Sequence, residues 1–145
     1  MAQSGQYNYA RCMRRHDEVA ASLALNEFVE QTLSVIYLLN KRYKPYYKWS
    51  YYGLKDCHCL KDVAPLLKQL ILCPSQLKHW NENVEAINRN DPKVVMIEKI
   101  CSKIIVELNR QGLTNHYDDF LENHTKNVMG HIEDRMIKSK HVMEG

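Results

Sequence analysis

Ten consecutive residues of the sequence concentrate groups that could bind an anionic ligand. Residues 40–49, NKRYKPYYKW, contain four cations and four aromatic rings. Lysine and arginine pair with phosphate or carboxylate groups, and aromatic faces stack on bases. The ligand-binding candidates in this stretch are Asn40, Arg42, Tyr43, Lys48 and Trp49. We expect one of the two cations to pair with an anionic group, one of the two rings to stack, and the Asn40 amide to orient the ligand.

The same ten residues also have a purely structural interpretation. The helix dipole favours cations at a helix C-terminus, so Lys41 and Arg42 can serve only as caps. Pro45 disfavours a helical conformation at Lys44 and turns the chain. The aromatic side chains would then close the end of a hydrophobic core. The sequence leaves both interpretations open.

Four polar residues elsewhere in the chain are further candidates for the same ligand site. They are Tyr7, Asn8, Arg11 and His124. They would join the site if they faced the same end of the long helix that precedes residue 40. The alternative is a polar network that ties helix ends together. For His124, which lies between Phe120 and Val128 at steps of four, a hydrogen-bonded core residue is the more common role.

We predict no metal ligand and no catalytic residue in this chain. Four residues have types suited to zinc: Cys57, Cys59, Cys73 and His79. Their spacing differs from that of zinc knuckles, which place two residues between paired cysteines. Asp118 and Asp119 precede Phe120 at a predicted helix start, where the helix dipole favours acidic residues. These aspartates therefore have a structural explanation.

One ribonuclease motif, an arginine followed by a histidine after four to six residues, occurs in a superfamily of RNA-cleaving helical bundles. Three pairs fit it: Arg11 with His16, Arg110 with His116, and Arg135 with His141. With seven arginines and seven histidines, about one match is expected by chance. Gly112 interrupts the second pair, and the third lies in a predicted frayed tail. A ribonuclease function is therefore kept only as an alternative.

The elements that must position these residues are helical. The chain has 145 residues with only four prolines and five glycines, and no linker-like stretch, which indicates one domain spanning residues 1–145. Apolar periodicity and stop signals predict helices over about 3–15, 18–44, 46–54, 60–71, 76–88, 92–111 and 115–139. Because the predicted connections are short, we expect an all-α up-and-down helical bundle, with a four-helix core and additional short helices.

Composition predicts a cytoplasmic protein with no membrane partner. The N-terminus has no apolar leader, and no apolar stretch reaches the ~18 residues of a membrane span. Without a secretory signal, the five cysteines are expected to be reduced thiols. The net charge of +3, with acids and bases interspersed, argues against a dedicated nucleic-acid binder.

The first part of the chain resembles a known family. Residues 3–49 carry the resemblance, within them GQYNYARCMRRHDEVAASLALNEFVEQTLSVIYLLNKRYKPYYKW, and residues 107–124, ELNRQGLTNHYDDFLENH, extend it over nearly the whole chain. The family is an uncharacterised bacterial helical domain found C-terminal to a minimal nucleotidyltransferase domain. It is similar to the C-terminal domain of kanamycin nucleotidyltransferase and to separate substrate-binding subunits, in the HEPN-like superfamily.

This resemblance implies a substrate- or nucleotide-binding helical domain that is not catalytic on its own. In such systems the bundle forms one wall of a cleft, and carboxylates of the nucleotidyltransferase domain hold magnesium. We therefore expect magnesium and nucleotide only together with a nucleotidyltransferase domain or subunit on another part of a longer protein or on a separate chain. The alternatives are a HEPN-type ribonuclease or toxin, and a structural module that forms a homodimer or docks a partner.

Overall fold

Every regular element that the structure describes is helical, which confirms the predicted all-α class. The computed structural model describes residues 1–77, 80, 88 and 90–140, and no strand occurs in these ranges. The elements are the π-helix η1 (Gln3–Tyr9), α1 (Ala10–Arg14), α2 (Glu18–Leu39), α3 (Tyr47–Ser50), the 3₁₀ helix η2 (Tyr52–Asp56), α4 (Val63–Leu72), α5 (Pro92–Arg110), the 3₁₀ helix η4 (Leu121–His124), α6 (Thr125–Gly130) and α7 (Arg135–Lys138).

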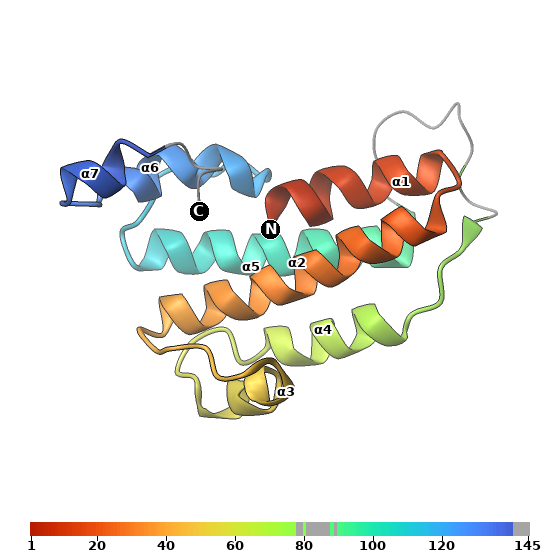
Figure 1. Ribbon diagram of the computed structural model, residues 1–145, viewed down its shortest axis with the longest axis horizontal. Helices are drawn as coiled ribbons and strands as arrows, with labels where there is room; N and C mark the ends of the chain where they lie inside the picture. Colours follow the sequence, from red (N-terminus) through yellow and green to blue (C-terminus); the bar gives the residue numbers. More distant parts are fainter. Residues whose placement is uncertain (78–79, 81–87, 89, 141–145) are drawn as a thin grey trace.

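The long helices pack side by side with their directions alternating (Figure 1). η1 and α1 form one continuous rod that runs antiparallel to α2, and α4 runs antiparallel to α5. α5 also contacts η1 and α2, so it joins the two pairs. α6 and α7 lie beyond the start of η1 (Figure 1). The short connection between α1 and α2 joins antiparallel neighbours, as expected, whereas residues 73–91 separate α4 from α5.

The core lies where η1, α2, α4 and α5 meet. Phe28 and Ile36 of α2 and Ile104 of α5 are fully buried. A β-carbon placed on Gly5 would overlap the Phe28 ring, so η1 can approach α2 this closely only because residue 5 is glycine. Close packing of this kind fixes the position of η1 on the middle of α2.

α2 ends at Leu39, and the predicted continuation to Lys44 is therefore wrong. The Lys41 amide donates to the Leu38 carbonyl at 2.9 Å, and the Arg42 amide donates to the Tyr37 carbonyl at 3.0 Å. Lys41 has the left-handed φ of 54°. This pair of bonds with one left-handed residue is the Schellman helix ending. The prediction missed it because the left-handed position carries lysine, where glycine is usual.

Two other helices end in the same way. The left-handed residue is His16 after α1, with φ 55°, and Gly112 after α5, with φ 71°. The His16 amide donates to the Met13 carbonyl, and the Gly112 amide donates to the Asn109 carbonyl, both at 3.0 Å. The predicted end of the 92–111 helix before Gly112 is therefore confirmed, because glycine adopts this conformation without steric cost.

The single long helix predicted over 115–139 is wrong. The chain after α5 stays non-helical until η4, and only then forms α6 and α7. The Asp118 carboxylate accepts a hydrogen bond from the Phe120 amide at 2.8 Å, and the Gln6 side chain donates to the Asp119 carbonyl at 2.9 Å. These side chains occupy backbone groups that a continuous helix would need for itself.

The predicted start of α5 is confirmed, and the helix predicted before it falls mostly outside the described residues. The Asp91 carboxylate accepts from the amides of Lys93 and Val94, and Pro92 occupies the first turn. Trp80, in the stretch predicted as helix 76–88, is buried and donates from Nε1 to Asp91 Oδ2 at 3.0 Å.

In the part of the chain that the structure describes, no helix is both long and apolar enough to traverse a bilayer.

Candidate functional site

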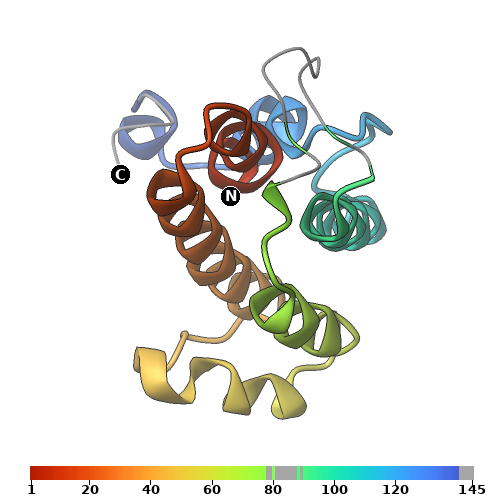
Figure 2. The ribbon, with the colours of Figure 1, turned by 90° about the vertical axis from the view of Figure 1, so that its right-hand side faces the viewer.

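The residues after α2 form an ordered platform, which we call the aromatic segment (residues 41–55). It contains α3 and most of η2 and lies at one edge of the molecule, below the ends of α2 and α4 (Figure 2). Side-chain hydrogen bonds tie it to neighbouring parts of the chain. The Tyr37 hydroxyl donates to the Ser50 carbonyl at 2.8 Å, Arg42 Nη1 to the Asp56 carbonyl at 2.6 Å, and the Tyr51 hydroxyl to the Ala64 carbonyl at 3.1 Å.

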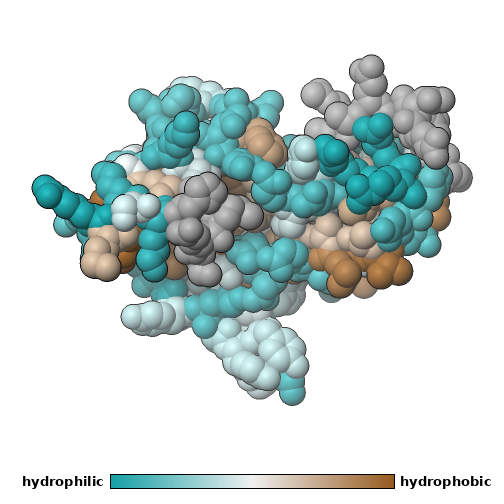
Figure 3. Space-filling view, turned by 45° about the horizontal axis from the view of Figure 1, so that its top comes forward, coloured by the Kyte–Doolittle hydropathy of each residue, from teal (hydrophilic) through white to brown (hydrophobic). Residues whose placement is uncertain are grey.

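The side chains of this platform point outward. Five rings are more than half exposed: Tyr43, Tyr46, Tyr47, Trp49 and Tyr52. Tyr43 is fully exposed and Trp49 is 63% exposed. In Figure 3 the pale side chains of the aromatic segment project from the lower edge of the molecule. These five rings therefore do not close the end of the core, as the structural interpretation had expected. The buried Leu54 contributes to the core there.

The predicted cations of the segment have different surroundings. Arg42 and Lys48 are exposed, and Arg42 reaches back to the Asp56 carbonyl. Lys44 forms an ion pair with Glu30 of α2. The Lys55 ammonium lies 3.9 Å from the centre of the Tyr52 ring, in a cation–π contact. The segment thus offers charged groups beside exposed rings, without enclosing them in a pocket, and ligand binding by residues 40–49 stays a prediction.

Asn40 faces the protein. Its amide nitrogen donates to the carbonyls of Ile36 at 2.8 Å and Cys59 at 3.2 Å. Its oxygen accepts from the amides of His58 at 2.6 Å and Cys59 at 3.0 Å. These four bonds fasten the loop at residues 58–59 to the end of α2. Asn40 is therefore committed to a polar network that joins chain segments, a role that the sequence analysis considered only for Tyr7, Asn8, Arg11 and His124.

A cleft of about 670 Å³ opens where α2 and α5 end, and we call it the α2–α5 cleft. It is lined by Leu39, Asn40, Lys41, His58, Cys59, Arg110 and Gln111. The sequence analysis singled out only Asn40 of these as a ligand group. It missed Lys41, His58 and Arg110 as possible anion partners. The sequence did show that cationic residues stand at the C-terminal ends of both long helices. It did not show that the two helices end side by side.

Glu107 organises one wall of this cleft. Its carboxylate accepts from Arg110 Nε at 2.8 Å and Nη2 at 2.6 Å, and from Gln111 Nε2 at 2.6 Å. The Arg110 guanidinium holds the pKa of the Glu107 carboxyl at about 2, well below its usual range. Gln111 also donates to the Leu39 carbonyl at 2.9 Å, which links the end of α5 to α2. The Glu107–Arg110 pair is neutral, so the exposed Lys41 gives the cleft a net positive charge.

Burial and a hydrogen bond to Glu107 raise the pKa of the Cys59 thiol above its usual value. A raised pKa keeps the thiol protonated at neutral pH, and a thiol is a much weaker nucleophile than a thiolate. Cys59 therefore contributes to the wall of the cleft as a small protonated side chain. This placement gives no support for a nucleophilic role.

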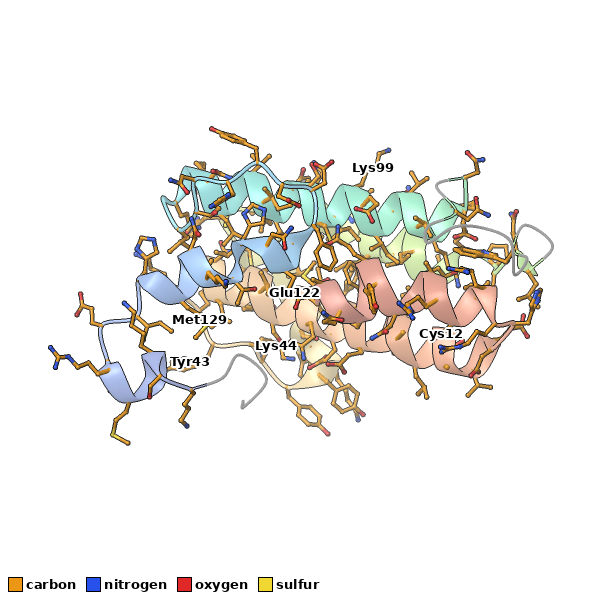
Figure 4. The ribbon with its side chains drawn as sticks, turned by 90° about the horizontal axis from the view of Figure 1, so that it is seen from above. Cys12, Tyr43, Lys44, Lys99, Glu122 and Met129 are labelled. Atoms are coloured by element: carbon orange, nitrogen blue, oxygen red, sulfur yellow. The ribbon has the colours of Figure 1, made fainter. Side chains whose placement is uncertain are left out.

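The candidates Tyr7, Asn8 and Arg11 lie away from the aromatic segment. All three are exposed on η1 and α1. The Arg11 guanidinium is 4.7 Å from the centre of the Tyr7 ring and donates to its hydroxyl. Because η1 and α1 run antiparallel to α2, these residues lie beside its N-terminal half. In Figure 4, Cys12 of α1 and Tyr43 lie at opposite ends of α2, so the structure does not bring the two groups together.

His124 is a buried, fully hydrogen-bonded residue. Its Nε2 donates to the Asp118 carbonyl at 2.8 Å, and its Nδ1 lies 3.0 Å from the Thr114 hydroxyl. Only 1% of the residue is exposed. These contacts hold the loop after α5 against η4. They match the core role that the sequence analysis gave as the more common one.

The arginine–histidine pairs of the ribonuclease motif are found in unrelated surroundings. His16 is the exposed left-handed residue after α1, while Arg11 contacts Tyr7. Arg110 pairs with Glu107, and His116 lies on the loop beyond the end of α5. His141, like His79 of the zinc hypothesis, lies outside the described residues. Within residues 1–77 and 90–140, no group of three or more histidine, cysteine, aspartate or glutamate side chains could hold a metal ion.

A second cleft, of about 520 Å³, lies between α5, η1 and the loop before η4. It is lined by Gln6, Val94, Val95, Glu98, Lys99, Ser102, Asp119 and Phe120. Gln6 donates to Glu98 Oε2 at 2.8 Å and to the Asp119 carbonyl at 2.9 Å, and its oxygen accepts from the Leu121 amide at 2.9 Å. Its amide is thus committed to holding the loop. None of the predicted site residues lines this cleft.

Comparison with known proteins gives one similarity. Residues 1–50 match the model of a domain of unknown function, DUF4037. The matched stretch contains residues 3–49, on which the predicted family resemblance depends. No curated protein and no solved structure matches the chain. The similarity to an uncharacterised domain family is therefore supported over the first fifty residues, and the similarity predicted for residues 107–124 stays a prediction.

Proposed function

We propose that this chain is a substrate- or nucleotide-binding helical domain that accompanies a nucleotidyltransferase and does not catalyse on its own. One observation carries the proposal: the α2–α5 cleft places Lys41, His58 and Arg110 around one opening, and the aromatic segment continues directly from Lys41. Cations next to exposed rings suit a ligand that has both phosphate groups and a base.

The proposed division of labour follows from the side chains present. Lys41 would pair with phosphate oxygens at the cleft and His58 would donate a hydrogen bond to them, while Tyr43 or Trp49 would stack on the base. Arg42 and Lys48 would add charge from the segment. Nucleotidyl transfer needs carboxylates that hold a metal ion against the triphosphate. We assign those carboxylates to the partner domain or subunit, within a HEPN-like, up-and-down four-helix arrangement that acts in the cytoplasm.

A thermal-shift measurement with nucleotides, aminoglycosides and small polyols tests this proposal. A ligand at a hundredfold excess over its dissociation constant stabilises the folded state by about 2.7 kcal/mol. The test variant is Lys41→Gly with His58→Ala. Glycine suits the left-handed position of Lys41, so this variant removes cleft charge without harming the fold.

We expect a nucleotide to raise the melting temperature of the wild type and to have a much smaller effect on the cleft variant. Lys126→Gln, an exposed change on α6, is the matched control and should behave like the wild type. Arg42→Ala with Lys48→Ala measures the contribution of the segment. A wild-type protein that is folded and shows no shift with any ligand would contradict the proposal.

A docking or homodimer role is the second candidate, and one observation favours it. Val19 and Leu23, one turn apart on α2, are 73% and 66% exposed. Sedimentation of the wild type and of Leu23→Glu tests it, with a concentration-dependent dimer expected only for the wild type. A monomeric wild type at all concentrations would exclude the homodimer.

The HEPN-type ribonuclease stays a prediction, tested by RNA cleavage that His116→Ala abolishes.

A further inference from the structure

The charge of the aromatic segment differs from that of the whole chain. The net charge is only +3, yet no acidic residue occurs between Glu30 and Asp56. The segment contains five cations in this interval, and one of them, Lys44, is paired with Glu30. Four exposed cations remain: Lys41, Arg42, Lys48 and Lys55. The segment is therefore a local positive surface that an average over the sequence hides.

The exposed rings of the segment keep faces available for a ligand, although the Lys55 ammonium covers one face of Tyr52. The rings of Tyr46 and Tyr47 are tilted by 58° with their centres 4.6 Å apart. Those of Trp49 and Tyr52 meet edge to face at 6.4 Å. Neither pair is a parallel stack. Large contiguous exposed aromatic surfaces are uncommon on monomeric proteins and mark binding sites.

The platform is held in place before any ligand arrives. Ser50 and Leu54 are buried, and the Tyr37 hydroxyl bonds the Ser50 carbonyl. A β-carbon on Gly53 would overlap that hydroxyl, so the glycine lets the segment pack tightly against Tyr37. The anchored backbone thus holds the rings in exposed positions. Little conformational entropy of the backbone would therefore be lost when a ligand binds.

We propose that the aromatic segment binds single-stranded nucleic acid. Several exposed rings spread over ten residues can stack several bases, while a mononucleotide would occupy one ring. The four cations can pair with successive phosphates. Stacking platforms combined with positive charge are the usual means of binding single strands without reading their sequence. This inference rests on the proposed function and deepens it, because it makes a polynucleotide the substrate class.

Fluorescence anisotropy with a labelled oligouridylate of about ten nucleotides, within the ~4–16 that single-strand sites cover, tests the proposal. The matched arms are oligothymidylate and a duplex of the same length. We expect both single strands to bind and the duplex to bind at least about tenfold more weakly, because its bases are already stacked. Stronger binding of the uridylate than of the thymidylate would assign RNA as the ligand.

Three variants locate the site. Tyr43→Ser with Trp49→Ser should weaken oligonucleotide binding by at least about tenfold, since the variant loses two rings on which bases would stack. Tyr117→Ser removes an equally exposed ring outside the segment and should leave binding unchanged. Lys48→Gln should reduce the slope of log affinity against log salt by about 0.7 from an expected value of about −3 for four phosphate contacts.

Failure of the wild type to bind any single strand at about 50 mM salt overturns the inference, and so does equal binding by the ring variant. These results would favour a protein partner on the same surface. The thermal-shift test with mononucleotides separates the two proposals. If mononucleotides stabilise the wild type and single strands do not bind, the polynucleotide inference fails while the proposed function survives. If no nucleotide and no single strand binds, both fail.

Discussion

The middle of α2 and the segment that follows its C-terminus use aromatic side chains in opposite ways. Phe28 is fully buried and in contact with η1, whereas Tyr43 is fully exposed. Both regions have a well-anchored backbone. The difference shows that exposure of the aromatic segment is not a sign of a poorly packed chain end. The exposed rings of the segment contribute little to folding. They therefore remain available to bind a partner.

The largest expected effect separates these two rings. Phe28→Ala should reduce the free energy of unfolding by about 3–5 kcal/mol, because it removes a ring from the core and leaves a cavity. Tyr43→Ala should change it by no more than ~0.5 kcal/mol, because water already surrounds that ring. Urea denaturation monitored by circular dichroism measures both. Equal losses in the two variants would mean that the segment is part of the core.

The next effect concerns the close approach of η1 to α2. Gly5→Ala places a methyl group against the Phe28 ring and should destabilise the protein by about 1–3 kcal/mol through overpacking. Gly130→Ala is the control, because a β-carbon there meets nothing within 4 Å and alanine favours the helix. The control should be neutral or slightly stabilising in the same denaturation experiment. A neutral Gly5→Ala would show that the two helices are farther apart than described.

A comparable effect is expected where the loop at residues 58–59 meets the end of α2. Asn40→Ala removes four hydrogen bonds to Ile36, His58 and Cys59, and we expect a loss of about 2 kcal/mol, since each bond contributes ~0.5–1.5 kcal/mol net and some groups recover bonds to water. Asn8→Ala, on the exposed side of η1, serves as the control and should have little effect. If instead Asn40→Ala is neutral and nucleotide binding falls, Asn40 is a ligand group as the sequence analysis predicted.

The last effect is confined to acid pH. The folded-state pKa of Glu107 is held at about 2, below its value of about 4.3 in the unfolded chain. Its contribution to stability is therefore complete above the unfolded value and is lost as the pH falls towards 2. Unfolding measured between about pH 7 and pH 2 should show a steeper acid loss for the wild type than for Glu107→Gln. Parallel curves would contradict the Arg110–Glu107 contact.

The sequence by itself determined the helical class, the capped start of α5 at Asp91 and its end before Gly112. These features depend on neighbours a few residues away, such as an aspartate that bonds the next amides and a glycine that adopts a left-handed backbone. It also marked the cations and rings of residues 40–49. Short-range signals of this kind remain readable without the fold.

Only the tertiary structure decided where α2 ends, why the last segment breaks and which groups share a site. Lys41 adopts a conformation that its residue type does not announce, and Gln6 bonds the backbone at Asp119 across the molecule. The α2–α5 cleft exists because two helices end at the same place. The end of α2 is formed by local bonds around a left-handed lysine, which no residue pattern marks. The break in the last segment and the shared site depend on contacts between residues far apart in the chain, whose partners no local pattern names.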